Sequence, residues 1–180
     1  LAFGVQQVAD RADVALATLY NHFATKQDLV LAAAADAALR VEAYLEDVTA
    51  GIDDPLGRLA MRGRLHGRLH ESHPKEARVL LATALHVASF ENAMRSETMR
   101  LAELASAERG LDDETVRLTA LMAYATTQHL LAHQLAGSHH GPGDVDRLVA
   151  LLLRLAGLSD ADAERLAHAP LPTQPKGPRP

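Results

Sequence analysis

Apolar residues recur along the chain at spacings of three and four positions, which is the period of an amphipathic α-helix. Leu, Ala, Arg and Glu dominate, and runs of β-branched residues are scarce, so strands are not expected. The pattern predicts two short helices at residues 5–12 and 16–23, followed by a longer helix from about residue 25 to residue 49. We therefore expect an all-α fold.

Capping residues and prolines mark the bounds of the later helices. Thr25 followed by Asp28 has the spacing of a capping box, and Asp54 followed by Pro55 is a typical helix start. Gly110, Gly137 and Gly157 stand where helices are expected to end. The remaining predicted helices cover residues 55–73, 74 onward, 90–110, 112–137, 144–156 and 159–168.

The order of these helices predicts three parts. Residues 1–48 hold the two short helices and most of the longer one, and residues 49–169 form a larger helical bundle. Residues 170–180 are proline-rich and are expected to be disordered.

The charge balance argues mildly against a nucleic-acid partner, because phosphate binding usually requires a basic surface. The formal net charge is -5 with histidine counted as neutral. A local excess of basic residues lies between residues 55 and 80, but helical spacing spreads its arginines around the helix axis. We expect a solvated helix face here, made by Arg58, Arg62, Arg64, Arg68 and Arg78.

Several classes of protein are excluded by what the sequence lacks. It contains no cysteine, so disulfide scaffolds, thiolate metal sites and cysteine nucleophiles are ruled out. No apolar run is long enough to span a membrane, and no phosphate-binding loop, dinucleotide-binding glycine pattern or nucleophile elbow occurs. We therefore expect a cytoplasmic protein that is not an enzyme and has no catalytic residues and no cofactor.

Two short helices joined by a tight turn form a helix-turn-helix, whose second helix can enter the major groove of DNA. The small residues Ala9 and Ala12 allow the two helices to approach closely. We expect Val14 to be a buried wedge in the turn, with Leu19 and Phe23 in the core beneath the second helix. The other side chains of that helix then face outward.

Residues 8–33 resemble the DNA-binding segment of the TetR family of transcriptional regulators. The resemblance rests on Thr-Leu-Tyr-Asn-His-Phe at residues 18–23 and on Lys26 after a short spacer. It implies phosphate contacts by Thr18, Tyr20, His22 and Lys26, while an asparagine at position 21 has the geometry to read adenine. A packing role for the tyrosine against the long helix is the alternative. The full set expected at DNA is Ala15, Leu16, Ala17, Thr18, Tyr20, Asn21, His22 and Lys26.

The segment before Val5 departs from the family pattern. Members of the family carry a complete helix and a short threonine-containing loop there, and Leu1 to Gly4 are too few residues to supply them. We therefore expect that residues which precede or interrupt this segment are missing from the sequence. Those residues are often basic in such proteins, which would offset the acidic balance of residues 1–47.

The resemblance also implies a dimeric repressor that a small-molecule effector releases from operator DNA. Leucines surround more of the predicted helix 144–156 than one core-facing stripe needs, so we expect it to be buried both in its own subunit and against a partner. Its companion is the helix at residues 112–136. The apolar residues concerned are Leu148, Val149, Leu151, Leu152, Leu153 and Leu155.

An effector pocket is expected among the middle helices, where methionine adapts to irregular ligands. Gln128 and His129 are the polar groups expected to orient a ligand. The candidate pocket residues are Met61, Leu85, Phe90, Met94, Met122, Tyr124, Gln128 and His129.

Two other interpretations remain open. One is a metal-responsive regulator, because His66/His70 and His129/His133 are pairs at a spacing that places both rings on one helix face. The other is a helical interaction module without DNA binding, for which the acidic first segment is the argument. We expect no physiological metal site, because no acidic residue stands at a telling offset from either pair.

Overall fold

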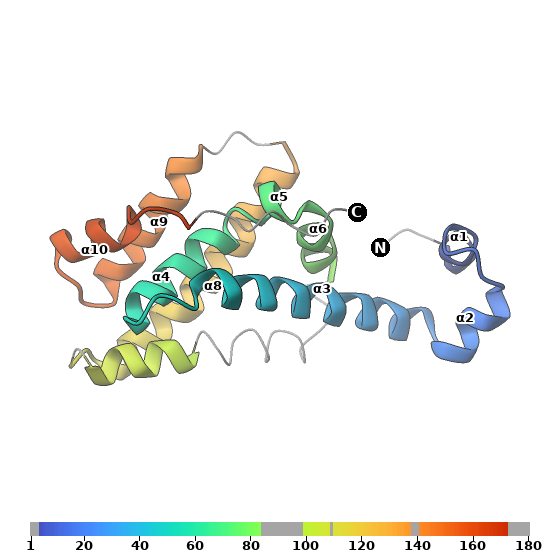
Figure 1. The fold of residues 1–180 in the computed structure, drawn as a ribbon, viewed down its shortest axis with the longest axis horizontal. Coiled ribbons are helices and arrows are strands. Elements are labelled where there is room, and N and C mark those ends of the chain that lie inside the picture. Colours follow the sequence, from blue (N-terminus) through green and yellow to red (C-terminus); the bar gives the residue numbers. More distant parts are fainter. Residues whose placement is uncertain (1–3, 84–98, 109, 138–140, 173–180) are drawn as a thin grey trace.

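The computed structural model describes residues 4–83, 99–108, 110–137 and 141–172, and every regular element in these ranges is a helix. At one end of the molecule, α1 (Val5–Arg11) and α2 (Leu16–His22) form a small unit. The long helix α3 (Lys26–Thr49) begins in this unit and extends into a larger bundle at the other end (Figure 1). The all-α prediction and the helix-turn-helix at the N-terminal end are thus confirmed.

The bundle is built on the second half of α3. This helix packs against α6 and α4, while α9 packs against α8, α10 and α4 (Figure 1). The elements are α4 (Pro55–His66), α5 (Leu69–Ser72), α6 (Pro74–Thr83), a helical stretch at residues 99–108, α8 (Asp113–Leu135), α9 (Pro142–Leu155) and α10 (Asp160–Ala167). The predicted start near residue 90 and the tail from residue 173 lie outside the described residues.

Side-chain caps begin several of these helices, as the sequence predicts. The Thr25 hydroxyl accepts from the Asp28 amide at 3.1 Å, and the Asp28 carboxylate accepts from the Thr25 amide at 2.9 Å. Asp54 accepts from the amide of Gly57 at 3.2 Å. α9 begins two residues before the predicted start, because the Asp144 carboxylate reaches back to the Gly141 amide at 2.9 Å and therefore occupies the third helical position.

The predicted helix at residues 55–73 is broken, which corrects the sequence-based boundary. α4 ends at His66, and the short α5 follows after Gly67 and Arg68. A Cβ atom on Gly67 would lie 2.8 Å from Cγ1 of Val145, so α9 approaches the backbone more closely than a side chain permits. The break lies where α9 packs closely against the backbone after α4. The sequence pattern could not predict this contact, because the two segments are far apart in the chain.

The largest core cluster lies where α3, α4, α5, α6 and α8 meet. It includes the fully buried Val41, Leu69, Leu80 and Leu131, each from a different helix. A second cluster joins α4 to α9 and α10 through residues such as Leu56, Val149 and Leu153. The first cluster anchors α3 in the bundle, and the second holds the other helices together.

Three arginines of the basic stretch are not on the solvated face that the sequence predicts, although Arg78 is exposed. Arg62, Arg64 and Arg68 are all buried. Nε of Arg64 lies 2.7 Å from a carboxylate oxygen of Asp146, and Nη2 of Arg68 lies 2.8 Å from the same oxygen. The physical reason is that carboxylates on α3 and α9, far away in the sequence, compensate the charges of α4 inside the bundle.

The turn between α1 and α2 is closed by the backbone. The Val14 amide donates to the Ala9 carbonyl at 3.0 Å, and Asp13 has a φ of +54°. The Val14 side chain is 39% exposed, so it is not the buried wedge predicted. This backbone bond sets the turn and leaves the side chain pointing outward. Leu19 is buried as predicted, whereas Phe23 is only partly buried.

Candidate functional site

The outer face of α2 presents polar side chains at the end of the molecule. Thr18, Tyr20, Asn21 and His22 are exposed there, and the tyrosine is 47% exposed. Lys26 is the first residue of α3 and is partly buried. The chain therefore brings these predicted DNA contacts to one end of the molecule, with Ala15, Leu16 and Ala17 at the start of the same helix.

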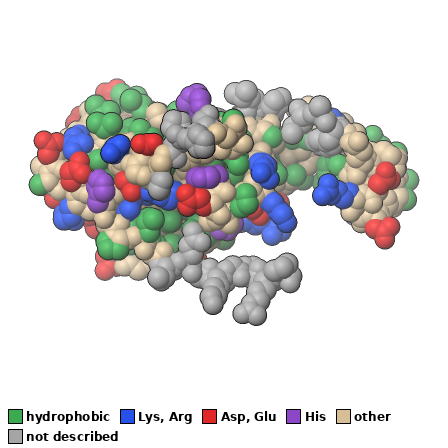
Figure 2. All heavy atoms as spheres, turned by 90° about the horizontal axis from the view of Figure 1, so that it is seen from above, with side chains coloured by type: hydrophobic (Ala, Val, Ile, Leu, Met, Phe, Trp, Pro, Cys, Tyr) green, Lys and Arg blue, Asp and Glu red, His purple; other side chains and the backbone are tan. Residues whose placement is uncertain are grey.

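Charges of both signs surround this face. Arg11 stands beside Asp10 and Asp13 near the turn, and all three side chains are exposed. Figure 2 shows acidic and basic side chains together at the end formed by α1 and α2. Hydroxyl, amide and imidazole groups, together with a lysine at a helix N-terminus, are the groups expected at phosphates and base edges.

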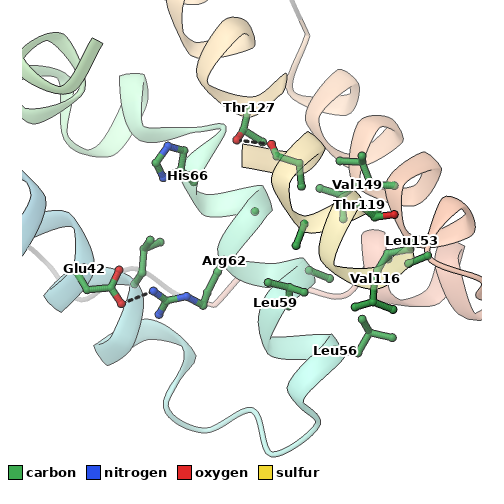
Figure 3. Close-up of a pocket in the computed structure, with 17 residues that line it drawn as sticks. Glu42, Leu56, Leu59, Arg62, His66, Val116, Thr119, Thr127, Val149 and Leu153 are labelled. Carbon is green, nitrogen blue, oxygen red and sulfur yellow. Dashed lines mark hydrogen bonds and ion pairs between the residues drawn. The ribbon is translucent and has the colours of Figure 1, made fainter. Parts of the chain in front are cut away.

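A cavity lies inside the bundle at the other end of α3 (Figure 3). α3, α4, α8 and α9 all contribute to its wall, which is mostly apolar. The lining residues are Glu42, Leu45, Leu56, Leu59, Ala60, Arg62, Gly63, His66, Val116, Thr119, Ala120, Ala123, Thr127, Val149, Leu152, Leu153 and Ala156.

One side of the cavity is polar. The Arg62 guanidinium of α4 points toward the Glu42 carboxylate of α3 and donates a hydrogen bond to it (Figure 3). His66 lies one turn further along α4, and burial lowers the pKa of its imidazole to about 4. The nearby Gln128 opposes this shift, and the charge of Arg62 adds to it. The histidine is therefore neutral at pH 7.

The predicted pocket residues that the structure describes do not line this cavity. Met61 belongs to the core cluster beneath α3, and Met122 is exposed. Gln128 lies beside His66 but is not among the lining residues. His129 is exposed, and the centroid of its ring lies 4.5 Å from that of His133. Positions 85, 90 and 94 and the side chain at position 124 lie outside the described residues. The cavity is instead lined mostly by small and branched apolar residues, which the sequence pattern does not distinguish from ordinary core residues.

The histidine pairs are not joined by further ligands. Among the residues that the structure describes, no group of three or more His, Cys, Asp or Glu side chains could hold a metal ion. In the first pair, His66 is buried, whereas Nε2 of His70 lies 3.6 Å from Oε1 of the adjacent Glu71. None of the described helices is long and apolar enough to cross a membrane.

Apolar side chains also remain exposed on α8 and α9, which pack against each other. Leu118 and Met122 stand one turn apart on α8, and Leu151 and Leu155 stand one turn apart on α9. Each of the four side chains is between 46% and 56% exposed. The neighbouring Leu152 is buried, so α9 is apolar on more than its core-facing side.

The described residues thus combine a helix-turn-helix, a long helix that leads away from it, and a bundle with a cavity beside that helix. Residues 1–33 match the family model described as bacterial regulatory proteins, tetR family. A search of the curated proteins found no match.

Solved structures show the same fold along almost the whole chain. The crystal structure of RolR without ligand aligns with a TM-score of 0.69 and 22% identity, over 97% of this chain and 90% of RolR. RolR in complex with resorcinol aligns with a TM-score of 0.67 and 22% identity, over 97% of this chain and 87% of RolR. The crystal structure of AmtR from Mycobacterium smegmatis aligns with a TM-score of 0.60 and 20% identity, over 92% of this chain and 83% of AmtR. The chain therefore matches the TetR family over residues 1–33 and shares its overall fold with RolR and AmtR.

Proposed function

We propose that this protein is a cytoplasmic repressor that binds operator DNA as a homodimer and leaves it when a small molecule occupies the cavity. In this proposal residues 1–48 bind DNA, residues 49–169 bind the effector and form the dimer, and residues 170–180 are a disordered tail. The observation that carries the proposal is the path of α3. Its first residues belong to the helix-turn-helix, and Glu42 and Leu45 near its other end line the cavity.

The mechanism is a shift between two arrangements of the bundle. An effector that binds better to the arrangement in which α3 has moved lowers DNA affinity by the difference between its two binding free energies. RolR is a protein of this fold whose structure is known with resorcinol, which supports a small organic molecule as the effector. Saturating effector is expected to raise the Kd for operator DNA, and a Kd that does not change would contradict the mechanism.

DNA binding is tested with the full chain, its own upstream DNA and a random duplex of equal length, over a series of salt concentrations. We expect specific binding that weakens in the double variant Tyr20→Ala/Lys26→Ala. The slope of log K against log salt should fall by about one for each phosphate that the variant no longer neutralises. Lys75→Ala, at an exposed lysine of α6, is the matched control and should bind like the wild type. Equal binding to both duplexes would contradict the proposal.

The dimer is proposed to form through the exposed apolar residues of α8 and α9. Two half-sites on DNA require two recognition helices at a set separation, and an isologous interface provides it. Leu151→Glu is expected to yield monomers in analytical ultracentrifugation, because it places a charge in the interface. Leu39→Glu changes a leucine that is 70% exposed on α3 and should leave the dimer intact. A dimeric Leu151→Glu protein would exclude this surface.

A further inference from the structure

The polar side of the proposed effector pocket carries hydrogen-bonding groups that are incompletely used. The Arg62 side chain is only 6% exposed, and it donates from Nη2 to Oε1 of Glu42. Its second terminal nitrogen, Nη1, is buried and lies 3.6 Å from the carboxylate of Glu46, beyond hydrogen-bond distance. The second oxygen of Glu42, Oε2, is also buried and accepts no hydrogen bond from the part of the chain that the structure describes.

A buried donor and a buried acceptor without hydrogen bonds are costly, because each has lost its water without gaining a hydrogen bond in return. The two groups belong to side chains that are hydrogen-bonded to each other through Nη2 and Oε1. Both side chains line the cavity. A hydroxyl group, which is both an acceptor and a donor, has the chemistry that these two groups lack.

The charges of this wall are balanced before any ligand arrives. Arg62 is paired with Glu42 and contacts Glu46, while Arg58 is hydrogen-bonded to Glu46. Arg62 and Glu42 are the charged residues of the lining, while Arg58 and Glu46 pair with each other outside it. The rest of the lining is apolar apart from a neutral imidazole and two threonines. A charged ligand would enter a low-dielectric site with no counter-charge to spare.

We propose that the pocket binds an uncharged, largely apolar molecule that carries a hydroxyl group. The hydroxyl oxygen accepts from Nη1 of Arg62, and the hydroxyl proton is donated to Oε2 of Glu42. The apolar body contacts Leu56, Val149 and Leu153 on the opposite wall (Figure 3). This inference rests on the proposed function and deepens it, because the ligand would bridge α3 and α4 at the residue pair that joins them.

Three probes of nearly equal size separate the possible ligand chemistries. At pH 7, 2-naphthol is an uncharged aromatic hydroxyl compound, naphthalene lacks the polar group, and 2-naphthoate is an anion. Their binding to the full-length protein is measured by fluorescence titration. We expect 2-naphthol to bind at least about tenfold more tightly than either of the others, because it satisfies hydrogen bonds to charged groups that would otherwise stay unmade.

Variants then assign this preference to the polar wall. Arg62→Met should abolish the tenfold advantage of 2-naphthol over naphthalene. Arg58→Met is the matched control, because it also removes an ion pair between α4 and α3 but lies outside the cavity lining. It should keep the advantage. The comparison of the three probes on the wild-type protein needs no variant, so the proposal can be tested even if Arg62→Met fails to fold.

Each opposing result overturns the proposal. Tightest binding of 2-naphthoate would make the wall an anion site, and equal binding of the three probes would show that Arg62 and Glu42 take no part. Absence of binding by all three would show that the cavity does not accept this class of molecule. Specific binding to upstream DNA, measured separately, would survive any of these results, so failure of this inference and failure of the proposed DNA-binding function are distinguishable.

Discussion

The two ends of the molecule are held together in different ways. Within α1 and α2 the buried side chains are Ala9 and Leu19, and almost every polar residue faces outward. In α4 most residues are buried, charged ones included. The helix-turn-helix therefore has few buried side chains and a turn closed by a backbone bond, whereas the bundle depends on contacts between distant segments. The proposed function requires this face to meet DNA, and such a face cannot also be covered by protein.

The treatment of charge differs in the same way. Asp36 and Arg40 on the exposed part of α3 form a surface ion pair at 2.8 Å, with each side chain 63% exposed. The pairs that Asp146 makes with Arg64 and Arg68 are buried in the bundle. Surface pairs contribute little to stability because water and salt screen them, but a buried charge that loses its partner is strongly destabilising.

Removing one carboxylate from each region gives the largest expected contrast. Asp146→Asn leaves two arginines buried without an anion, and we expect it to lower the free energy of unfolding by about 3 kcal/mol. Asp36→Asn should change it by less than about 0.5 kcal/mol. Urea unfolding at pH 7 measures both values. Similar small changes in the two variants would show that water reaches the Asp146 cluster.

Acid should destabilise the bundle through His66. The folded-state pKa of about 4 lies below the unfolded value of about 6.5. As the pH falls below 6.5, the unfolded chain therefore binds a proton that the folded protein excludes, and stability is lost until the pH passes the folded-state pKa. Between pH 7.5 and pH 5 this histidine should account for a loss of about 2 kcal/mol.

Urea unfolding of the wild type and of His66→Gln at the two pH values isolates this contribution, since the other histidines are common to both proteins. The wild type should lose more stability on acidification than the variant does. Equal losses in the two proteins would mean that the imidazole is hydrated in the folded state.

Two glycines of the α4 region should respond oppositely to alanine. At Gly67 a Cβ atom would lie 2.8 Å from Val145, so Gly67→Ala is expected to cost about 1–3 kcal/mol through overpacking. At Gly63 the nearest atom, on Val149, would be 3.7 Å away, so Gly63→Ala should stabilise the helix by about 0.5–1 kcal/mol. Thermal unfolding of both variants gives the signs. A neutral Gly67→Ala would show that α9 shifts freely.

The smallest effect is expected in the turn of the helix-turn-helix. Asp13 adopts a left-handed conformation that glycine adopts without strain, so Asp13→Gly should stabilise this unit by about 0.5 kcal/mol. Asp10→Gly, in the helical part of α1, should destabilise it. Hydrogen exchange of the α1 and α2 amides reports this local stability. A loss of protection in Asp13→Gly would show that the aspartate side chain has a further role in the turn.

The order of the helices and most of their starts could be predicted because they depend on neighbouring residues. The Thr25–Asp28 capping box and the caps at Asp54, Asp112 and Ser159 connect groups only three residues apart, so the sequence displays both partners together. The family resemblance is equally local, since it lies within one continuous segment. These features would be recognised in any context in which the helices form.

The interior of the bundle depended instead on how the helices pack. Glu42 and Arg62 are twenty residues apart, and Arg64 and Asp146 are eighty-two apart, so no spacing rule links them. The arginines therefore resembled an exposed face, and the cavity could not be assigned to Leu56, Val149 or Leu153. The sequence alone determined an all-helical chain with a TetR-type recognition segment. The tertiary structure decided which charges are buried and where a ligand can enter, because burial is set by the distant segments that surround a side chain.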